Sequence, residues 1–463
     1  MTSAVLTPIT WIVGDGNFIL AQRLTVLAAG IANIVLLWLL GRRHSPRLGS
    51  LLALLGAIDI RLLLSDVLIL SETFGVTLIT LTLLVLWPRQ QGGPQEPAVG
   101  GSVAPLGTGL PQPDQQFQPD QPDQPDQPDQ PDQPYRSGPS DQPYRSGRLW
   151  AAGVLLGLLV LTRAELLFVI PLVSAWLWWQ HPQRRRWNSL ASAMVPALVA
   201  AAVLAPWIGW NLLRFDARTT LSTNDGFTLL GANCPDTYYG DNLGGYSINC
   251  ALSVAGQPGM DASEVSTLRR ETATVYAGEH LTRLPLVAAA RFARQWEIGW
   301  VGRTAADSPA EGRPEELVLA ATAQWWLLGA VAVVGARRAG RPLLTLMLIT
   351  PTVVTFAAVS VNAQWRLRVA VEPPLLVVAG LGILALLGRH AAALGDDLRD
   401  SSEVVEVAGP GDQVGPGDQV VEVAGDQVGP GDQVGPGDDA VATVAAAEVS
   451  ALGEHQPLVH PDR

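Results

Sequence analysis

The chain has 463 residues, 48% of them hydrophobic and 16% charged, with a mean hydropathy of +0.23 and a formal net charge of −12. This average is high for a chain that also carries long polar tracts. It argues against an ordinary soluble protein and favours a helical membrane protein. Much of the acid lies in two repetitive tracts, and every fixed cation is an arginine because the sequence contains no lysine. We expect the lipid bilayer as a partner and no nucleic acid.

Nine apolar stretches approach the ~20 residues that a helix needs to cross a bilayer core. In chain order they lie at about 22–41, 48–62, 67–87, 149–162, 165–180, 188–210, 318–335, 342–362 and 373–389. Some are short for a full crossing, so two of them can be half-helices or re-entrant segments. The sequence therefore predicts an all-α, polytopic transmembrane protein with about nine membrane segments.

Arginine-rich short loops predict the orientation of these segments. Such loops stay in the cytoplasm, and three are present, at 41–47, 181–187 and 336–341. One orientation satisfies all three, and it places the long polar segment 211–317 outside. We expect a multi-pass plasma-membrane protein whose main loop is extracytoplasmic.

Composition divides the chain into six parts. We expect an N-terminal transmembrane part (1–90), a repeat linker (91–148) and central transmembrane helices (149–210). An extracytoplasmic loop region (211–317), C-terminal transmembrane helices (318–390) and a repeat tail (391–463) follow. The linker repeats "PDQ" and the tail repeats "GPGDQV". Segments so rich in proline, glycine and charge cannot bury enough apolar surface to offset the entropy of ordering, so both are expected to be disordered and cytoplasmic, as tethers or tolerated linkers.

Two cysteines, Cys234 and Cys250, bracket a loop rich in glycine, asparagine and tyrosine within the extracytoplasmic region. A disulfide between them would contribute ~3 kcal/mol by restricting the unfolded chain, and it would need the oxidising compartment that the orientation provides. The alternative is two free thiols. No CxxC or Cys/His metal-binding spacing occurs, so we expect no cysteine-based metal site.

Ionisable residues next to membrane helices are functional candidates by default. Asp66 and Glu72 flank "VLILS", Arg163 lies in "LTRAELL", and Arg366 and Arg368 precede the apolar helix that starts at Pro373–Pro374. Guanidinium groups match phosphate oxygens, and neighbouring carboxylates can act as a general base or hold a divalent metal, which leaves the metal requirement open. The sequence therefore predicts catalytic carboxylates at Asp66 and Glu72 and a lipid-phosphate site formed by the three arginines.

Plainer interpretations stand beside this one. Arg366 and Arg368 could extend from the interface towards water, and Glu72 could simply pair with a nearby arginine. Because proline disfavours α conformation in the residue before it, we expect Glu372 and both arginines on extended or turning backbone, with the two guanidiniums pointing the same way. Asp59 and Arg61 look like surface charges.

Six motifs occur in the order seen in glycosyltransferases of the GT-C superfamily. They are "AQRLTVLAAGIANIVLLWLLGRR", "SDVLILSETFG", "AAGVLLGLLVLTRAELLFVIPL", "APWIGWNLLRFDARTTLSTNDGFTLLGAN", "LTRLPLVAAARFARQW" and "WRLRVAVEPPLLVVAGLG". The chain most resembles the bacterial branch similar to protein mannosyltransferases and aminoarabinose transferases, over about 1–90 and 149–390.

The resemblance implies transfer of a sugar from a polyprenyl-phosphate donor to a cell-envelope glycan, lipid or protein acceptor on the outer face. Asp66 and Glu72 match the family's acidic positions, Arg163 matches its "LTR" turn, and Arg366 and Arg368 match an "RYR"-like motif in which this chain has Leu367. The family's first helix and its loop with the principal catalytic aspartate have no counterpart here, so we also expect an N-terminally truncated chain that could be inactive. The alternative function is a non-catalytic membrane protein, or a transporter or flippase of lipid-linked saccharides.

Overall fold

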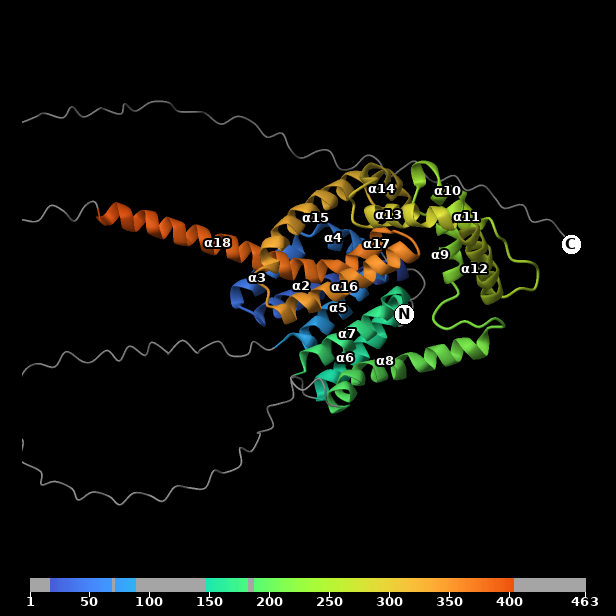
Figure 1. Cartoon of the computed structure of the whole chain (residues 1–463), viewed down its shortest axis with the longest axis horizontal. Helices are drawn as coiled ribbons and strands as arrows, with labels where there is room; N and C mark the ends of the chain where they lie inside the picture. Colours follow the sequence, from blue (N-terminus) through green and yellow to red (C-terminus); the bar gives the residue numbers. More distant parts are fainter. Residues whose placement is uncertain (1–16, 69–70, 89–145, 182–186, 404–463) are drawn as a thin grey trace, which may run out of the picture. The chain divides into compact units, whose positions relative to one another are not determined.

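The structure is a computed structural model that describes residues 17–68, 71–88, 146–181 and 187–403, and over these ranges the secondary structure is entirely helical (Figure 1). The principal helices of the membrane part are α2 (Phe18–Arg42), α3 (Pro46–Ala57), α4 (Ile60–Val67), α5 (Glu72–Leu86), α6 (Ser146–Thr162), α7 (Val169–Gln180), α8 (Trp187–Arg214), α15 (Glu315–Ala336), α16 (Arg341–Ser360), α17 (Trp365–Arg368) and α18 (Glu372–Glu403). Between α8 and α15 lie α9 (Asp225–Ala232), α10 (Pro235–Tyr238), α11 (Ile248–Leu252), α12 (Ala262–Glu279), α13 (Leu284–Gln295) and α14 (Val301–Asp307). The all-α prediction is confirmed for the described ranges.

Five stretches of the described chain are long and apolar enough to cross a membrane, namely Ile19–Arg42, Trp187–Arg214, Glu315–Ala336, Arg341–Ser360 and Trp365–Gly388. The pair α3 and α4, bent by 55°, would make a sixth if it is one span. Three further apolar helices, Glu72–Leu86, Ser146–Thr162 and Ala164–Gln180, have 15 to 17 residues. At 1.5 Å per residue they are about 22–26 Å long, short of a ~30 Å core. A membrane protein is therefore supported, but the predicted count of nine segments is not.

The bend between α3 and α4 has a local cause. Asp59 caps α4 by accepting a hydrogen bond from the Leu62 amide at 2.9 Å, so the helix restarts in a new direction. The prediction of one apolar segment over 48–62 missed this break.

The predicted disordered linker, 91–148, lies outside the described residues except for its last three, which begin α6. The predicted tail from residue 391 also lies mostly outside them. Its first part, however, is helical, because α18 continues to Glu403.

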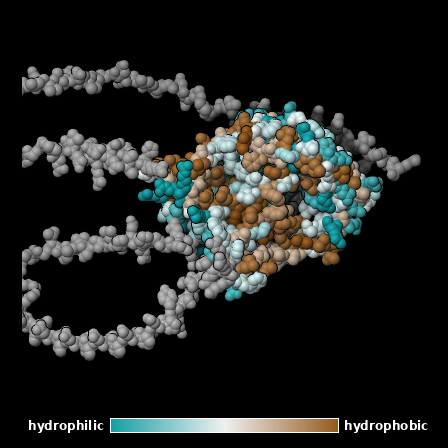
Figure 2. Space-filling model, in the orientation of Figure 1, coloured by the Kyte–Doolittle hydropathy of each residue, from teal (hydrophilic) through white to brown (hydrophobic). Residues whose placement is uncertain are grey.

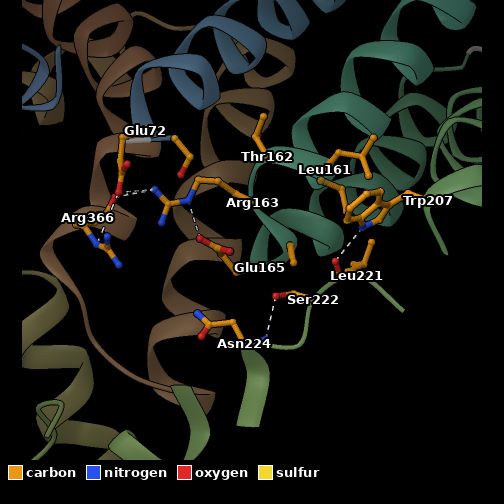
Figure 3. Close-up of a pocket in the computed structure, with 13 residues that line it drawn as sticks. Glu72, Leu161, Thr162, Arg163, Glu165, Trp207, Leu221, Ser222, Asn224 and Arg366 are labelled. Atoms are coloured by element: carbon orange, nitrogen blue, oxygen red, sulfur yellow. Dashed lines mark hydrogen bonds and ion pairs between the residues drawn. The ribbon is translucent and has the colours of Figure 1, made fainter. Parts of the chain in front are cut away.

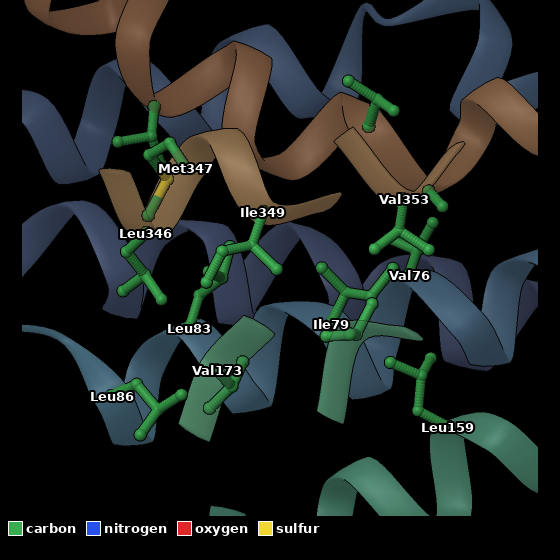
Figure 4. Packing of buried hydrophobic residues seen from close by; sticks show 14 of the residues in the cluster. Val76, Ile79, Leu83, Leu86, Leu159, Val173, Leu346, Met347, Ile349 and Val353 are labelled. Carbon is green, nitrogen blue, oxygen red and sulfur yellow. The ribbon is translucent and has the colours of Figure 1, made fainter. Parts of the chain in front are cut away.

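The core of the membrane part lies where α5, α6, α7 and α16 meet. Figure 4 shows Ile79 and Leu83 of α5 among aliphatic side chains from the other three helices, including Leu159, Val173 and Ile349. On the outside, hydrophobic residues cover the middle of the face seen in Figure 2, and hydrophilic residues gather towards its two ends. Exposed apolar residues in such a band are what a bilayer requires.

Glycines let neighbouring helices approach closely. A Cβ on Gly153 or Gly157 of α6 would lie 2.6 or 2.7 Å from a valine Cβ of α8. This small-xxx-small spacing is typical of helices packed within membranes.

Chain direction separates two ends of the bundle. α5 begins, α6 ends and α17 begins near the same place, as the contacts of Glu72, Arg163 and Arg366 show. Two helices show which ends lie far from this place. α7 begins at Val169, shortly after Arg163, and ends at Gln180. α16 begins at Arg341 and ends at Ser360, shortly before Arg366. Gln180 and Arg341 therefore lie at the helix ends that are opposite the charged cluster.

Candidate functional site

A cleft of about 700 Å³ opens at the charged end of the bundle. It lies between the start of α5, the turn after α6, the outer part of α8, the segment 221–224 and α17 (Figure 3). Its volume suits a small-molecule headgroup or a sugar.

One wall of the cleft is charged. Arg163 contacts Glu72 (Nη1 to Oε1, 3.4 Å) and Glu165 (Nε to Oε1, 2.6 Å), and Arg366 lies 3.7 Å from the same oxygen of Glu72. Arg163 also donates to the backbone carbonyl of Arg366 at 3.2 Å. Four ionised groups from three distant parts of the sequence thus converge, as Figure 3 shows.

These four groups differ in accessibility. The side chains of Arg163 and Glu72 are 8% and 3% exposed, whereas those of Glu165 and Arg366 are 31% and 37% exposed. Arg366 makes only long contacts, to Glu72 and to Gln364 Oε1 at 3.5 Å. Arg366 is therefore the cation in this cluster best placed to meet a ligand.

The opposite wall is apolar. It is formed by Val160 and Leu161 of α6, Trp207 of α8 and Leu221. The Trp207 indole N–H donates to the carbonyl of Leu221 at 2.9 Å, which fixes the ring at the rim. The cleft is thus amphipathic and suits a molecule that combines a charged group with an apolar one.

Local sequence explains how the charged wall forms. Arg163 has an extended backbone (φ −144°, ψ 99°), which ends α6 and turns its side chain towards α5. The Arg163 side chain packs against Gly75 of α5, where a Cβ would make ordinary van der Waals contact with the Arg163 Cδ at 3.6 Å. Glu72 stands in the first turn of α5, where the helix dipole favours a carboxylate. Its Oε2 is buried and has no hydrogen-bond partner among the described residues.

The structure corrects the prediction for Arg366 and Arg368. Both lie in the short helix α17, not on extended backbone, so side chains two residues apart point in different directions. Arg368 is 0% exposed, with its Nη2 2.6 Å from Glu297 Oε2 and its guanidinium over the ring of Trp325. Arg368 is therefore not a candidate phosphate ligand. Glu372 is also helical (φ −59°, ψ −47°), contrary to expectation, because its proline neighbours occupy the first turn of α18.

Arg368 belongs to a second cluster that the sequence did not reveal. Arg61 lies 2.8 Å from Glu372 and 3.3 Å from Glu297, so Glu297 bridges Arg61 and Arg368. Arg61 and the helix-capping Asp59 are each 2% exposed, and the prediction that they are surface charges is wrong. Arginine spacing alone could not have shown this, since Glu297 lies more than two hundred residues from Arg61.

Asp66 does not line the cleft. Its carboxylate lies 2.8 Å from the hydroxyl of Thr73 and against α2, where a Cβ on Gly30 would be 2.1 Å from Oδ2. Of the two predicted catalytic carboxylates, only Glu72 lies in the cleft. Glu165, two residues after Arg163 in the same turn, was not one of the two predicted catalytic carboxylates, but it lines the cleft.

Cys234 and Cys250 form a disulfide in the structure, with their Cα atoms 6.3 Å apart. The bond joins the start of α10 to α11. At the N-terminus of α12, ligand atoms of the carboxylates of Asp216, Asp261 and Glu264 lie within 4.8 Å of one another. Asp261 and Glu264 are already engaged in the capping box of α12, so this group needs no metal to explain it. In the cleft, Arg163 forms ion pairs with both Glu72 and Glu165.

No family model, curated protein or solved structure matches the chain.

Proposed function

We propose that the protein is a membrane glycosyltransferase of the GT-C type, which moves a sugar from a polyprenyl-phosphate donor to an acceptor on the extracytoplasmic side. The supporting observation is the amphipathic cleft, in which the partly exposed Arg366 faces an apolar wall that contains Trp207. A polyprenyl-phosphate sugar has a matching set of parts: an anionic phosphate, an isoprenoid chain and a sugar.

In this proposal Arg366 binds the phosphate. A guanidinium presents several N–H donors in a planar fork, which suits phosphate oxygens. Arg163 already holds Glu165 at 2.6 Å and Glu72 at 3.4 Å, so it mainly keeps the carboxylates and α17 in position. Leu161, Leu221 and Trp207 would contact the first isoprene units or the sugar.

The transfer itself needs few groups. The acceptor hydroxyl oxygen attacks the anomeric carbon, the bond between that carbon and the phosphate oxygen breaks, and polyprenyl phosphate leaves with the electron pair, held by Arg366. The acceptor proton passes to a carboxylate. Glu72 Oε2, which has no hydrogen-bond partner in the described part of the chain, and the more exposed Glu165 are the two proton acceptors that line the cleft.

One observation favours the alternative of a non-catalytic protein or a flippase. Arg163 holds both carboxylates of the cleft in ion pairs, so each of them already has a structural role that requires no catalysis. A site that only binds a lipid-linked saccharide would need nothing more than the arginine and the apolar wall.

Transfer assays with purified protein in proteoliposomes separate the two functions. Labelled polyprenyl-phosphate sugars would be offered with a cell-envelope extract as acceptor, and both loss of donor and appearance of labelled product would be measured. Arg366→Gln should reduce donor use, and Glu72→Gln should reduce transfer while donor binding remains. Arg303→Gln is the matched control, because Arg303 is an exposed arginine on α14 paired only with Asp307. Donor binding without transfer in the parent protein would favour the binding function over the enzyme.

A further inference from the structure

The helix α13 has an inverted pattern of polarity. Its exposed residues are all apolar: Pro285, Leu286, Ala289 and Phe292. These positions recur every three to four residues, so they form one stripe along the helix. We call this set the α13 stripe. A helix on the surface of a soluble domain would show the opposite pattern.

The polar side chains of α13 turn into the protein instead. Arg291 is 2% exposed and donates to the carbonyl of Ala232 at 2.6 Å. Gln295 is equally buried and accepts from the amide of Gln364 at 3.1 Å. Arg294 donates to two carbonyls of the segment 241–243. The polar side chains of the inward face form their hydrogen bonds with the protein, and the exposed side chains of the outward face cannot form hydrogen bonds with water.

The neighbouring helix α12 shows that this pattern is not general to the region. Four of its seven exposed positions are polar, namely Glu271, Thr272, Thr274 and Glu279, and Val275 is the one large apolar residue among them. Two helices that follow each other in the chain therefore present different surfaces, one suited to water and one to an apolar medium.

Contacts with α16 place α13 at the level where a membrane span ends. α16 has 20 residues and is about 30 Å long, which matches the bilayer core. Arg291 reaches the carbonyl of Val359, and the Trp296 indole donates to the Thr355 hydroxyl at 3.2 Å, so α13 lies against the last two turns of α16. The exposed Phe356 belongs to the same turns. Tryptophans such as Trp296 are typical of the membrane–water interface.

We infer that the α13 stripe is a lipid-contacting surface, which lies in the interface of the bilayer and contacts acyl chains. A second protein is a poorer match, because a 12-residue helix is only ~18 Å long and a specific protein interface buries on the order of 1,000 Å² or more. Ile298, 59% exposed just after the helix, extends the apolar surface. The inference does not depend on the proposed enzymatic function.

Site-directed spin labelling in phosphatidylcholine/phosphatidylglycerol vesicles tests it. Single cysteines replace Leu286, Ala289 and Phe292 on the stripe, and Thr272 and Glu279 on α12 as exposed controls, while the native cysteines remain in their disulfide. Collision rates with oxygen, which concentrates in lipid, and with a neutral nickel chelate, which stays in water, are measured for each label.

The expected result is a ratio of oxygen to nickel collisions several-fold higher at the three stripe positions than at the two α12 positions. Equal ratios on both helices would mean that water covers α13 and would overturn the inference. Low collision rates with both reagents at all three stripe positions would mean that protein covers the stripe, in a second copy or another partner, and would overturn it as well.

Discussion

Glu297 is the residue on which the second charged cluster depends. Its carboxylate bridges Arg61 and Arg368, and its backbone has a positive φ of 52°, which residues other than glycine seldom adopt. Strain of this kind, on the order of 1–3 kcal/mol, persists only where the surroundings impose the conformation. Two buried guanidiniums hold the side chain of Glu297, and the Trp326 indole donates to its carbonyl at 3.3 Å.

Replacing Glu297 by glutamine should therefore destabilise the protein strongly. Two buried arginines would lose a shared counter-charge, and breaking such a pair costs about 3–5 kcal/mol. Denaturant unfolding in detergent would measure the change. Arg303→Ala, which breaks an exposed pair, should change stability by less than about 1 kcal/mol. Equal effects of the two substitutions would show that the buried cluster is not structural.

The same residues show where sequence reasoning ended. It selected Glu72, Arg163 and Arg366 because each is an ionisable residue beside an apolar run, and the fold brings these three together. It could not separate Arg366 from Arg368, because that depends on the short helix α17. Glu297 gave no signal at all, since its partners are distant in sequence.

Helix packing depends on glycine contacts that substitutions can probe. A Cβ on Gly335 of α15 would lie 1.8 Å from the carbonyl oxygen of Val378 in α18, which is a clash with backbone. Gly335→Ala should therefore destabilise the protein by about 1–3 kcal/mol or more, as overpacking does. Gly329→Ala in the same helix meets nothing within 4 Å and should be neutral or stabilising by up to ~1 kcal/mol. Thermal unfolding of both variants in detergent would check this, and an unchanged midpoint for Gly335→Ala would rule out the α15–α18 contact.

The N-terminus of α12 should respond to acid. Hydrogen bonds from the Ser263 side chain and from the amides of Asp216 and Glu264 lower the pKa of Asp261 from 3.8 to about 2. Because its folded pKa is depressed, the carboxylate stabilises the fold above pH 3.8, and this contribution is lost as the pH falls towards 2.

Asp261→Asn keeps a capping oxygen but cannot titrate. The melting temperature of the parent should exceed that of this variant at about pH 5, and the difference should shrink as the pH approaches about 2. A difference that stays constant over that interval would contradict the depressed pKa.

At the scale of elements, apolar length was the reliable signal. The stretches predicted at 188–210, 318–335 and 342–362 correspond to helices within a few residues of their observed ends. The segments predicted at 67–87, 149–162 and 165–180 overlap the helices Glu72–Leu86, Ser146–Thr162 and Ala164–Gln180, which are too short to be counted as full spans by length. Hydropathy shows which residues avoid water. It does not show where a helix ends, because that depends on local features such as the turn at Arg163 and the cap at Asp59.

For the whole molecule, the arrangement of helix ends gives a testable topology. The loop 337–340 and the disulfide-bonded region around Gly240 lie beyond opposite ends of the bundle, and the arginine rule assigns the former to the cytoplasm. Cysteines introduced at Arg338 and Gly240, both exposed, should be labelled by an impermeant maleimide from opposite sides of intact cells. We expect position 240 to react from outside and position 338 only after permeabilisation. Labelling of both from one side would contradict the topology.

The most direct test of the central claim is the binding of polyprenyl phosphate to the purified protein in detergent, because it requires no catalysis. Arg366→Ala removes one charge-assisted contact, worth about 1.5–3 kcal/mol, and should weaken binding roughly tenfold to a hundredfold. Arg303 is a more exposed arginine outside the cleft, 52% against 37% for Arg366, and Arg303→Ala should leave the affinity unchanged. If Arg366→Ala binds as tightly as the parent and the control, the cleft is not a lipid-phosphate site and the proposed glycosyltransferase loses its supporting observation.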